Sequence, residues 1–250
     1  MIKIKNIEFA YHTELILKDL NVDFGKGLFS TIIGPNGSGK TTLMNLLTKH
    51  KAYKTGSIHI NKQKIESYSI ESFAKVAAVI SQNEQIKFPF TCLDVILMGR
   101  KPHIGKFGKY NDDDFEIVHD VMELTDTLCF QDTLVTEISG GEFQRVMLAQ
   151  ALAQEPEILF LDEAFSAMDL AYKLHFLRLI KKLVEKKNMT VISVMHDLNL
   201  AYRFSDTICV MKDGIVDGIG QPCHTLTEGR IKSVFGVDVE YIPEKGFLFL

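Results

Sequence analysis

The chain has 250 residues, of which 46% are hydrophobic and 24% charged, so it can bury a sizeable core and is not a disordered segment. Its formal net charge of −4 is too small to indicate nucleic acid or an anionic membrane surface as the primary partner. The 4 cysteines lie far apart and form no C-x-x-C pair, which favours a reduced cytosolic compartment over a disulfide framework or a zinc site.

Neither a signal peptide nor a membrane-spanning helix is expected from the sequence. Residues 1–11 mix charged and apolar side chains instead of building one apolar run. No stretch approaches the roughly 18 continuous apolar residues that a spanning helix needs. If the protein acts at a membrane, another chain is expected to span it.

The first eighty residues favour strands. Ile2, Ile4, Ile7 and Phe9 alternate with polar residues, apart from one slip, as in a half-buried strand. Further strands are expected at residues 15–24, 29–33, 58–60 and 76–81. The run at 29–33 is short, apolar and flanked by glycines, which is typical of a buried strand, and a helix is expected at 43–47.

The pattern changes to helix from about residue 88 to residue 153. Apolar residues recur at three- and four-residue spacing over 92–99, 112–124 and 142–153, with one loose loop expected at 99–114. Strand and helix then alternate: strands at 158–161, 190–195 and 207–211, and helices at 170–187 and 198–204. Alternation of this kind predicts an α/β fold with a mainly parallel sheet, into which the middle block is inserted as a helical unit.

A glycine-rich segment after the 29–33 strand fits the pattern G-x-x-x-x-G-K-[ST]. Backbone amides of such a loop and the N-terminus of the following helix bind phosphate groups. Lys40 is expected to reach the β- and γ-phosphates, and the Thr41 hydroxyl is expected to ligate Mg²⁺. A chance match in a glycine-rich turn is the alternative, but the strand before and the helix after match the required context. The predicted ATP-binding residues here are Gly34, Pro35, Asn36, Gly37, Ser38, Gly39, Lys40, Thr41 and Thr42.

Two carboxylates follow the buried 158–161 strand. Asp162 is placed to hold Mg²⁺ through water, and Glu163 is placed to polarise an attacking water. On its own, an apolar run that ends in Asp-Glu is more often a plain exit from a strand. Together with the glycine-rich cradle it indicates nucleotide hydrolysis.

The stretch Ser139-Gly140-Gly141-Glu142 narrows the class of enzyme. Ser139 can cap the following helix, while the two glycines leave its amides open to an anion. A Ser-Gly-Gly on its own is a common helix start. Here Ser139 precedes Asp162, and the order of the two motifs and their approximate spacing are those found in one family. The segment resembles the signature motif of ABC ATPases, and the resemblance covers nearly the whole chain.

The resemblance implies roles for four further residues. Tyr11 matches the aromatic residue that stacks on adenine, and Gln82 matches the glutamine that senses Mg²⁺ and links to the transmembrane partner. Asp169, in the segment 166–169, matches the loop by which one subunit contacts the other. His196 matches the histidine that reaches the γ-phosphate. The catalytic residues implied are therefore Glu163, His196 and Gln82.

The family also implies an architecture and partners. Residues 1–250 are expected to form a single ABC ATPase domain, a P-loop NTPase core with an N-terminal antiparallel β portion and a helical subdomain at about 88–155. The cofactors that the resemblance implies are ATP and Mg²⁺. An ATP-dependent homodimer is expected to act on transmembrane permease subunits at the cytoplasmic face of the cell membrane, and indirectly on a substrate-binding protein, with no nucleic acid involved.

The sequence departs from the family pattern at two places. Glu142 stands where glutamine is frequent, and Ala164-Phe165 replaces the usual Pro-Thr after the catalytic glutamate. Neither change removes a ligand, so activity is expected to survive. These changes could alter the geometry of the loop that leads to Asp169.

Two segments resemble one subgroup, the importers of iron–siderophores, haem and cobalamin. These are the Gly-Arg-x-Pro-His run at 99–103 and the stretch 195–201 around His196. An ATPase of a zinc or manganese importer is the alternative within the family. A non-transport ABC protein acting on DNA or ribosomes, or a stand-alone P-loop kinase, is the alternative outside transport.

Overall fold

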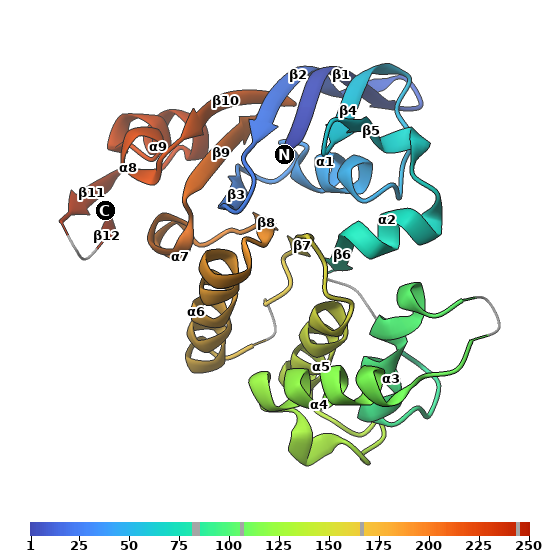
Figure 1. Ribbon diagram of the computed structural model, residues 1–250. Helices are drawn as coiled ribbons and strands as arrows, with labels where there is room; N and C mark the ends of the chain where they lie inside the picture. Colours follow the sequence, from blue (N-terminus) through green and yellow to red (C-terminus); the bar gives the residue numbers. More distant parts are fainter. Residues whose placement is uncertain (82–85, 106–107, 166–167, 244–245) are drawn as a thin grey trace. The chain divides into compact units, whose positions relative to one another are not determined.

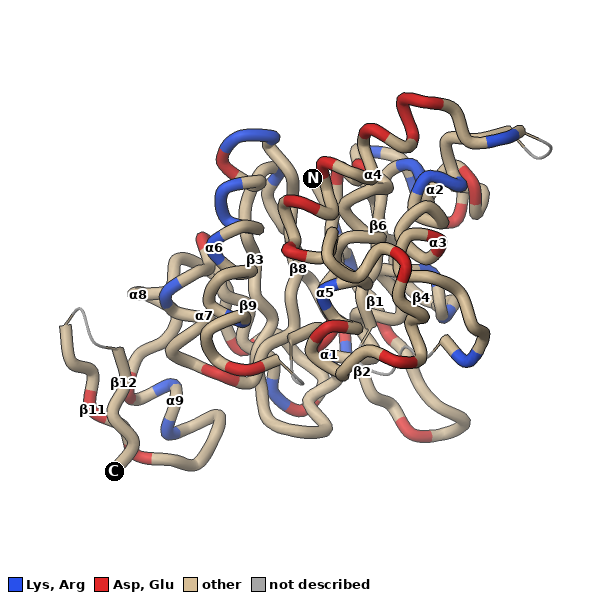
Figure 2. Tube along the Cα trace, turned by 90° about the horizontal axis from the view of Figure 1, so that it is seen from below, with Lys and Arg blue, Asp and Glu red and all other residues tan. Residues whose placement is uncertain are grey.

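The computed structural model describes residues 1–81, 86–105, 108–165, 168–243 and 246–250 of the chain (Figure 1). The chain divides into two compact units. Unit 1 comprises Met1–Ser67 and Lys181–Leu250, and unit 2 comprises Tyr68–Ile180. Basic and acidic residues are interspersed along the trace (Figure 2).

Unit 1 opens with an antiparallel sheet. Its strands run in the order β2 (Glu14–Phe24), β1 (Ile2–Tyr11), β4 (Thr55–Ile60) and β5 (Gln63–Lys64), and a 3-10 turn, η1 (Ile65–Ser67), follows. Ile2, Ile4 and Ile7 of β1 are buried, as predicted, and Phe9 is partly buried. The predicted slip lies between Ile4 and Ile7, where Asn6 has a φ of 49°, and two further register shifts follow it.

The second sheet of unit 1 positions the glycine-rich loop. Strand β3 (Phe29–Ile33) is buried throughout and pairs in parallel with β8 (Thr190–Val194) on one side and β9 (Thr207–Lys212) on the other. Strand β10 (Ile215–Gly220) joins β9 in antiparallel fashion. A continuous apolar strand of this kind is expected where both faces of a sheet are covered.

Helices and a hairpin complete unit 1. The helices are α1 (Lys40–Leu47), α7 (Leu198–Phe204), α8 (Pro222–Thr225) and α9 (Glu228–Phe235). Strands β11 (Val239–Ile242) and β12 (Gly246–Phe249) pair antiparallel at the C-terminal end. Phe247 of this hairpin belongs to the same buried apolar cluster as Ile33 and Leu198, so the tail packs on the parallel sheet through α7.

Unit 2 contains the parallel pair β6 (Ala77–Ile80) and β7 (Ile158–Asp162) and mostly helices. These are α2 (Ile70–Val76), α3 (Cys92–Leu97), the 3-10 segments η2 (Met98–His103) and η3 (Leu128–Phe130), α4 (Asp112–Leu124) and α5 (Gly140–Ala153). Helix α6 (Leu170–Lys187) begins in unit 2 and ends in unit 1. None of the helices in the described part of the chain is long and apolar enough to cross a membrane.

The predicted fold class, a mainly parallel sheet with an antiparallel portion and an inserted run of helices, is confirmed. Two local expectations were wrong. The expected strand at 76–81 starts one residue late because Val76 ends helix α2, whose seven residues are too few to show a sustained helical period. The expected loop at 99–114 contains the 3-10 segment η2 and the first turn of α4, because buried Arg100 and Asp114 hold the two together.

Candidate functional site

The glycine-rich loop forms a tight turn between β3 and α1. The Ser38 amide donates to the Pro35 carbonyl oxygen at 3.2 Å. Gly37 and Gly39 have φ values of 79° and 98°, which side chains rarely adopt. A Cβ on Gly39 would also lie 2.7 Å from Leu17 Cδ2. The local backbone therefore requires glycine at these two positions, as the cradle interpretation predicts.

Lys40 lies inside this turn. Its Nζ donates to the carbonyl oxygens of Gly34 at 2.8 Å and Pro35 at 3.0 Å, and the residue is 5% exposed. The buried Ser38 hydroxyl has no hydrogen-bond partner among the described residues. A buried ammonium and an unsatisfied hydroxyl beside a helix N-terminus are chemistry that fits a bound phosphate. Thr41 is exposed on the first turn of α1, and Thr42 is buried.

His196 lies at the same edge of the parallel sheet as the loop. Ile32 of β3 pairs with Val194 of β8, so Gly34 and His196 each stand two residues beyond paired positions. Carboxyl ends of adjacent parallel strands are where α/β proteins bind ligands. His196 is exposed there and precedes Asp197, the N-cap of α7.

Tyr11 ends strand β1, and the residue is 38% exposed. The ring packs edge-on against Phe9, with centroids 5.0 Å apart, and Lys51 Nζ lies 5.6 Å from its centroid. An exposed ring held by two neighbours is suited to stacking on a planar base. Its role as an adenine platform stays a prediction.

In unit 2, Asp162 and Glu163 come at the carboxyl end of β7. Both are partly buried, and Glu163 has a φ of 53°. Positive φ at a non-glycine residue is a backbone conformation that clusters at functional sites. The predicted Gln82 and residues 166–167 lie outside the described residues. Ala164 and Phe165, the departure after Glu163, are both buried, so this pair contributes apolar packing.

The predicted signature turn starts helix α5. Ser139 is the N-cap: the Glu142 amide donates to Ser139 Oγ at 3.3 Å, and the Ser139 amide donates to Glu142 Oε2 at 2.7 Å. The Ser139 amide, and then its hydroxyl, lower the pKa of the Glu142 carboxyl. Glutamate at this position therefore completes a capping box. Ser139 and Gly140 are exposed, with Gly141 beside them.

A pocket of about 240 Å³ connects the signature turn with the Asp169 loop. Ser139, Gly141 and Glu142 line it from α5, and Met168 and Asp169 line it from the segment before α6. Asp169 Oδ1 accepts a hydrogen bond from the Tyr172 amide at 3.0 Å and so caps α6. The structure thus brings the predicted signature residues and the predicted contact-loop residue together.

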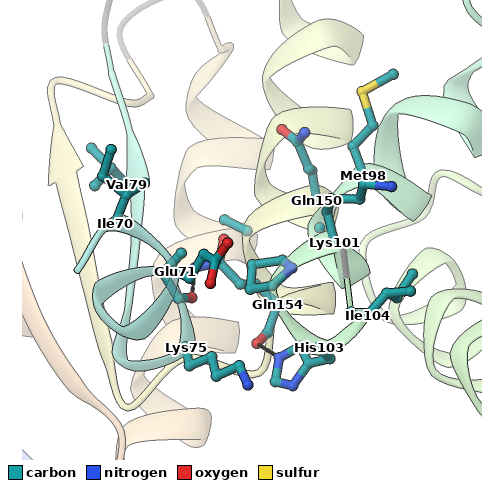
Figure 3. A pocket seen from close by; sticks show the side chains of 15 residues that line it. Ile70, Glu71, Lys75, Val79, Met98, Lys101, His103, Ile104, Gln150 and Gln154 are labelled. Carbon is teal, nitrogen blue, oxygen red and sulfur yellow. Dashed lines mark hydrogen bonds between the residues drawn. The ribbon is translucent and has the colours of Figure 1, made fainter. Parts of the chain in front are cut away.

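A larger groove, of about 740 Å³, lies elsewhere on unit 2 (Figure 3). Its walls come from α2, η2 and α5, with apolar Ile70 and Met98 and the polar side chains of Glu71 and Lys101. Ile70 is 86% exposed, and Met98 is 36% exposed. Exposed apolar side chains that line a groove are typical of a surface that binds another protein.

The Gly-Arg-x-Pro-His run forms one wall of this groove and fixes it to α5. A Cβ on Gly99 would lie 2.2 Å from the Gln150 carbonyl oxygen, so the backbones touch there. Arg100 Nη1 donates to the Ala153 carbonyl at 2.7 Å and to Glu155 Oε2 at 2.9 Å. The ring Nε2 of His103 hydrogen bonds with the Gln154 carbonyl at 2.9 Å, which Figure 3 shows. The motif therefore has a structural role at the C-terminal end of α5.

Arg100 also makes a buried ion pair with Asp114, the Nε–Oδ1 distance being 2.9 Å. Burial would raise the pKa of the Asp114 carboxyl, but hydrogen bonds from Arg100 and Asn111 and the charge of Arg100 outweigh it and lower the pKa. A carboxyl with a lowered pKa stabilises the fold above the ordinary carboxyl pKa, and this contribution is lost as the pH falls through the lowered value.

Replacement of Asp114 by asparagine is expected to lower the free energy of unfolding by about 3 kcal/mol at pH 7, because the buried guanidinium of Arg100 loses its buried anionic partner and keeps only the half-exposed Glu155. Urea unfolding of both proteins checks this. The difference should shrink as the pH falls through the lowered pKa of Asp114, because the wild-type carboxylate is then protonated. A difference that stays undiminished in strong acid would show that the charge of Asp114 is not its cause.

Sequence reasoning did not single out Arg145 and Tyr172. Arg145 lies over the ring of Tyr172, with its Cζ 4.5 Å from the ring centroid, and both line the 240 Å³ pocket. The spacing of Glu142 and Arg145, three residues apart on a helix, was the available signal. The contact with Tyr172 carries no local signal because it joins two helices.

Comparison with known proteins identifies the family. The ABC transporter family model matches residues 17–166, more than half of the chain. The ABC transporter ATP-binding protein YvrA of Bacillus subtilis is 38% identical over 238 residues, covering 95% of this chain and 54% of YvrA, so the chain spans about half the length of that relative. The Bacillus subtilis iron(3+)-hydroxamate import ATP-binding protein FhuC is 33% identical over 96% of this chain and 89% of its own length. The hemin import ATP-binding protein HmuV of Escherichia coli O157:H7 is 33% identical over 98% of this chain and 95% of its own length.

Solved structures of ABC transporter proteins superpose on this chain. A structure described as an inward-facing metal-chelate type ABC transporter superposes with a TM-score of 0.85 at 26% identity, covering 100% of this chain and 97% of that one. The ATP-binding cassette MJ0796, solved as a dimer bound to ADP and Pi after hydrolysis, superposes with a TM-score of 0.77 at 28% identity, covering 89% of this chain and 99% of that one. The chain belongs to the ABC transporter family and is one of its ATP-binding, ATP-hydrolysing subunits.

Proposed function

We propose that this chain powers uptake of an iron chelate, a siderophore complex or haem, or of cobalamin, through a separate permease. The observation that carries the proposal is the 33% identity to FhuC and to HmuV over nearly the full length of both chains. The Gly-Arg-x-Pro-His run at 99–103 supports the same subgroup. An ATPase subunit of a zinc or manganese importer is the second candidate. The whole chain is proposed to act as one ABC ATPase domain, with residues 88–155 as its helical subdomain.

ATP is proposed to bind at the loop between β3 and α1. In this proposal the backbone N–H groups of the loop from Asn36 to Gly39 surround the phosphates, and Lys40 Nζ donates to phosphate oxygens in place of the Gly34 and Pro35 carbonyls. The N-terminus of α1 adds its dipole. Tyr11 is proposed to stack on adenine, and His196 to hydrogen bond to the γ-phosphate from the adjacent strand end.

The residues proposed to hold Mg²⁺ have suitable chemistry, since the Thr41 hydroxyl and the Asp162 carboxylate are hard oxygen donors of the kind Mg²⁺ prefers. The Gln82 amide oxygen is proposed as a third. When bound, the ion would neutralise charge that develops on the phosphate oxygens. Glu163 is proposed as the group that orients the attacking water and accepts its proton.

The signature turn is proposed to act on a second copy of the chain. Ser139, Gly140 and Gly141 present an open helix N-terminus, which attracts the γ-phosphate of ATP held by the partner's cradle. Asp169 lies beside this turn in the pocket and is proposed to contact the partner. ATP thereby joins a head-to-tail dimer, and hydrolysis releases it.

The groove of Figure 3 is proposed to receive the permease at the cytoplasmic face of the membrane, with an extracytoplasmic substrate-binding protein acting through that permease. A charge placed on its apolar wall should then uncouple transport. Met98→Glu is expected to abolish uptake and membrane co-sedimentation while the purified chain still hydrolyses ATP. Ile215→Glu, which adds the same charge at a 46% exposed apolar residue of β10, serves as the matched control and should retain both.

Uptake assays test which substrate is transported, in cells in which this chain is the only such ATPase subunit. Labelled ferric siderophore, haem, cobalamin, zinc and manganese are supplied in turn to cells with wild type, Met98→Glu or Ile215→Glu at matched expression. Loss of iron-chelate or cobalamin uptake in the Met98→Glu cells alone supports the proposal. Loss confined to zinc or manganese uptake would replace it by the second candidate.

A further inference from the structure

Arg145 occupies a buried position one turn into helix α5. Its side chain is 9% exposed, and Nη1 donates to the Asp126 carbonyl oxygen at 3.1 Å. Nη2 lies 3.8 Å from Glu142 Oε1, the carboxylate of the capping box. Its Cζ lies 5.0 Å from the ring centroid of Phe130 and 4.5 Å from that of Tyr172.

The Tyr172 ring is the part of this cluster that belongs to another helix. Phe130 and Asp126 lie in the segment between α4 and α5, whereas Tyr172 is on the first turn of α6. The Tyr172 amide is the donor that Asp169 Oδ1 caps. Ser139, Gly141, Asp169 and Tyr172 all line the 240 Å³ pocket.

Cation–π attraction between a guanidinium and an aromatic ring is strongest where the cation is desolvated, as it is at Arg145. The Asp126 carbonyl accepts a hydrogen bond from Arg145, and the Glu142 carboxylate lies close enough to offset its positive charge. The ring of Tyr172 adds a contact between two helices. It joins α5, which begins at the signature turn, to α6, which Asp169 caps. A second link lies one turn further along α6, where His175 Nε2 is 3.7 Å from Asp126 Oδ2.

We infer that Tyr172 is a positioning residue which, through its contact with Arg145, holds the Asp169 loop in register with the Ser139 turn. The inference deepens the proposed function and rests on its ATP-joined dimer, because the Ser139 turn is proposed to face the partner's ATP and Asp169 is proposed to contact the partner. Without the ring, each segment keeps its own cap but loses the Arg145–Tyr172 contact, which is the link nearest to the pocket. The cradle at Gly34–Gly39 takes no part in this cluster, so nucleotide binding by a single chain does not depend on it.

The test compares dimerisation with single-chain binding in the full-length protein. In a Glu163→Gln background with saturating MgATP, Tyr172→Leu is expected to weaken dimerisation about tenfold, the effect of losing one desolvated cation–π contact. Tyr172→Phe keeps the ring and is expected to dimerise like its parent. Affinity for a fluorescent ADP analogue, measured on the single chain, should be unchanged in both variants.

Tyr110→Leu is the matched control, because Tyr110 packs edge-on against Phe115 in the same unit but does not line the pocket. It should leave dimerisation and ADP binding as in the parent, whatever it does to the melting temperature. The inference would be overturned if Tyr172→Leu dimerised as strongly as its parent. It would also be overturned if Tyr172→Phe dimerised as weakly as Tyr172→Leu. A parent that stays monomeric with MgATP would instead remove the dimer from the proposed function, and the inference would fall with it.

Discussion

Replacement of Glu163 by glutamine is expected to lower kcat for ATP hydrolysis by about 100- to 10,000-fold, the usual contribution of a general base. Glutamine has the shape of glutamate but cannot accept the proton of the attacking water. ATP affinity should be retained, because Glu163 is proposed to act on the water and not on the nucleotide. Steady-state hydrolysis and equilibrium binding of a labelled ATP analogue measure the two quantities separately.

The positive φ of Glu163 makes glutamine the informative substitution. Glutamine keeps an unbranched side chain and the same backbone cost, so only the charge changes. Glu137→Gln, the same change at an exposed glutamate that precedes the signature turn, is the control and should leave kcat unaltered. Comparable hydrolysis by Glu163→Gln and wild type would assign the base to another residue.

Replacement of Lys40 by alanine is expected to weaken ATP binding by about 10- to 100-fold, because charge-assisted hydrogen bonds to phosphate are lost. The ammonium already lies inside the loop, donating to the Gly34 and Pro35 carbonyls. A cation held in this place needs little rearrangement to reach a phosphate. Isothermal titration with ATP and with ADP measures the effect.

Lys54→Ala, at an exposed lysine between α1 and β4, is the control for the loss of one positive charge and should bind ATP like wild type. The Lys40 variant also loses the hydrogen bonds to the Gly34 and Pro35 carbonyls, so its fold is checked by thermal unfolding. A folded Lys40→Ala protein with undiminished ATP affinity would contradict the assignment of this loop as the phosphate cradle.

Much of the fold could be predicted because its strongest signals are local. The buried run at 29–33 followed by a glycine-rich segment predicted β3, the loop and α1 from neighbouring residues alone. The apolar spacing over 112–124, 170–187 and 198–204 predicted α4, α6 and α7 with the bounds that the structure has. Ser139 was predicted to cap a helix from its side chain and the glycines after it, and the capping box confirms this.

The features that sequence reasoning missed depend on contacts between distant segments. Helix α2 is only seven residues long, and its Ile70 is exposed in the groove wall, so its sequence pattern was too short to be singled out. Segment η2 is ordered by Arg100, whose partners Asp114 and Glu155 lie far along the chain. The pairing of Arg145 with Tyr172 likewise joins two helices and follows from no periodicity.

If ATP joins two copies of this chain, with each signature turn completing the other copy's cradle, the Glu163→Gln protein should dimerise without any permease. Sedimentation equilibrium should then find a dimer at saturating MgATP and a monomer with ADP. A monomer under both conditions would contradict an ATP-joined dimer.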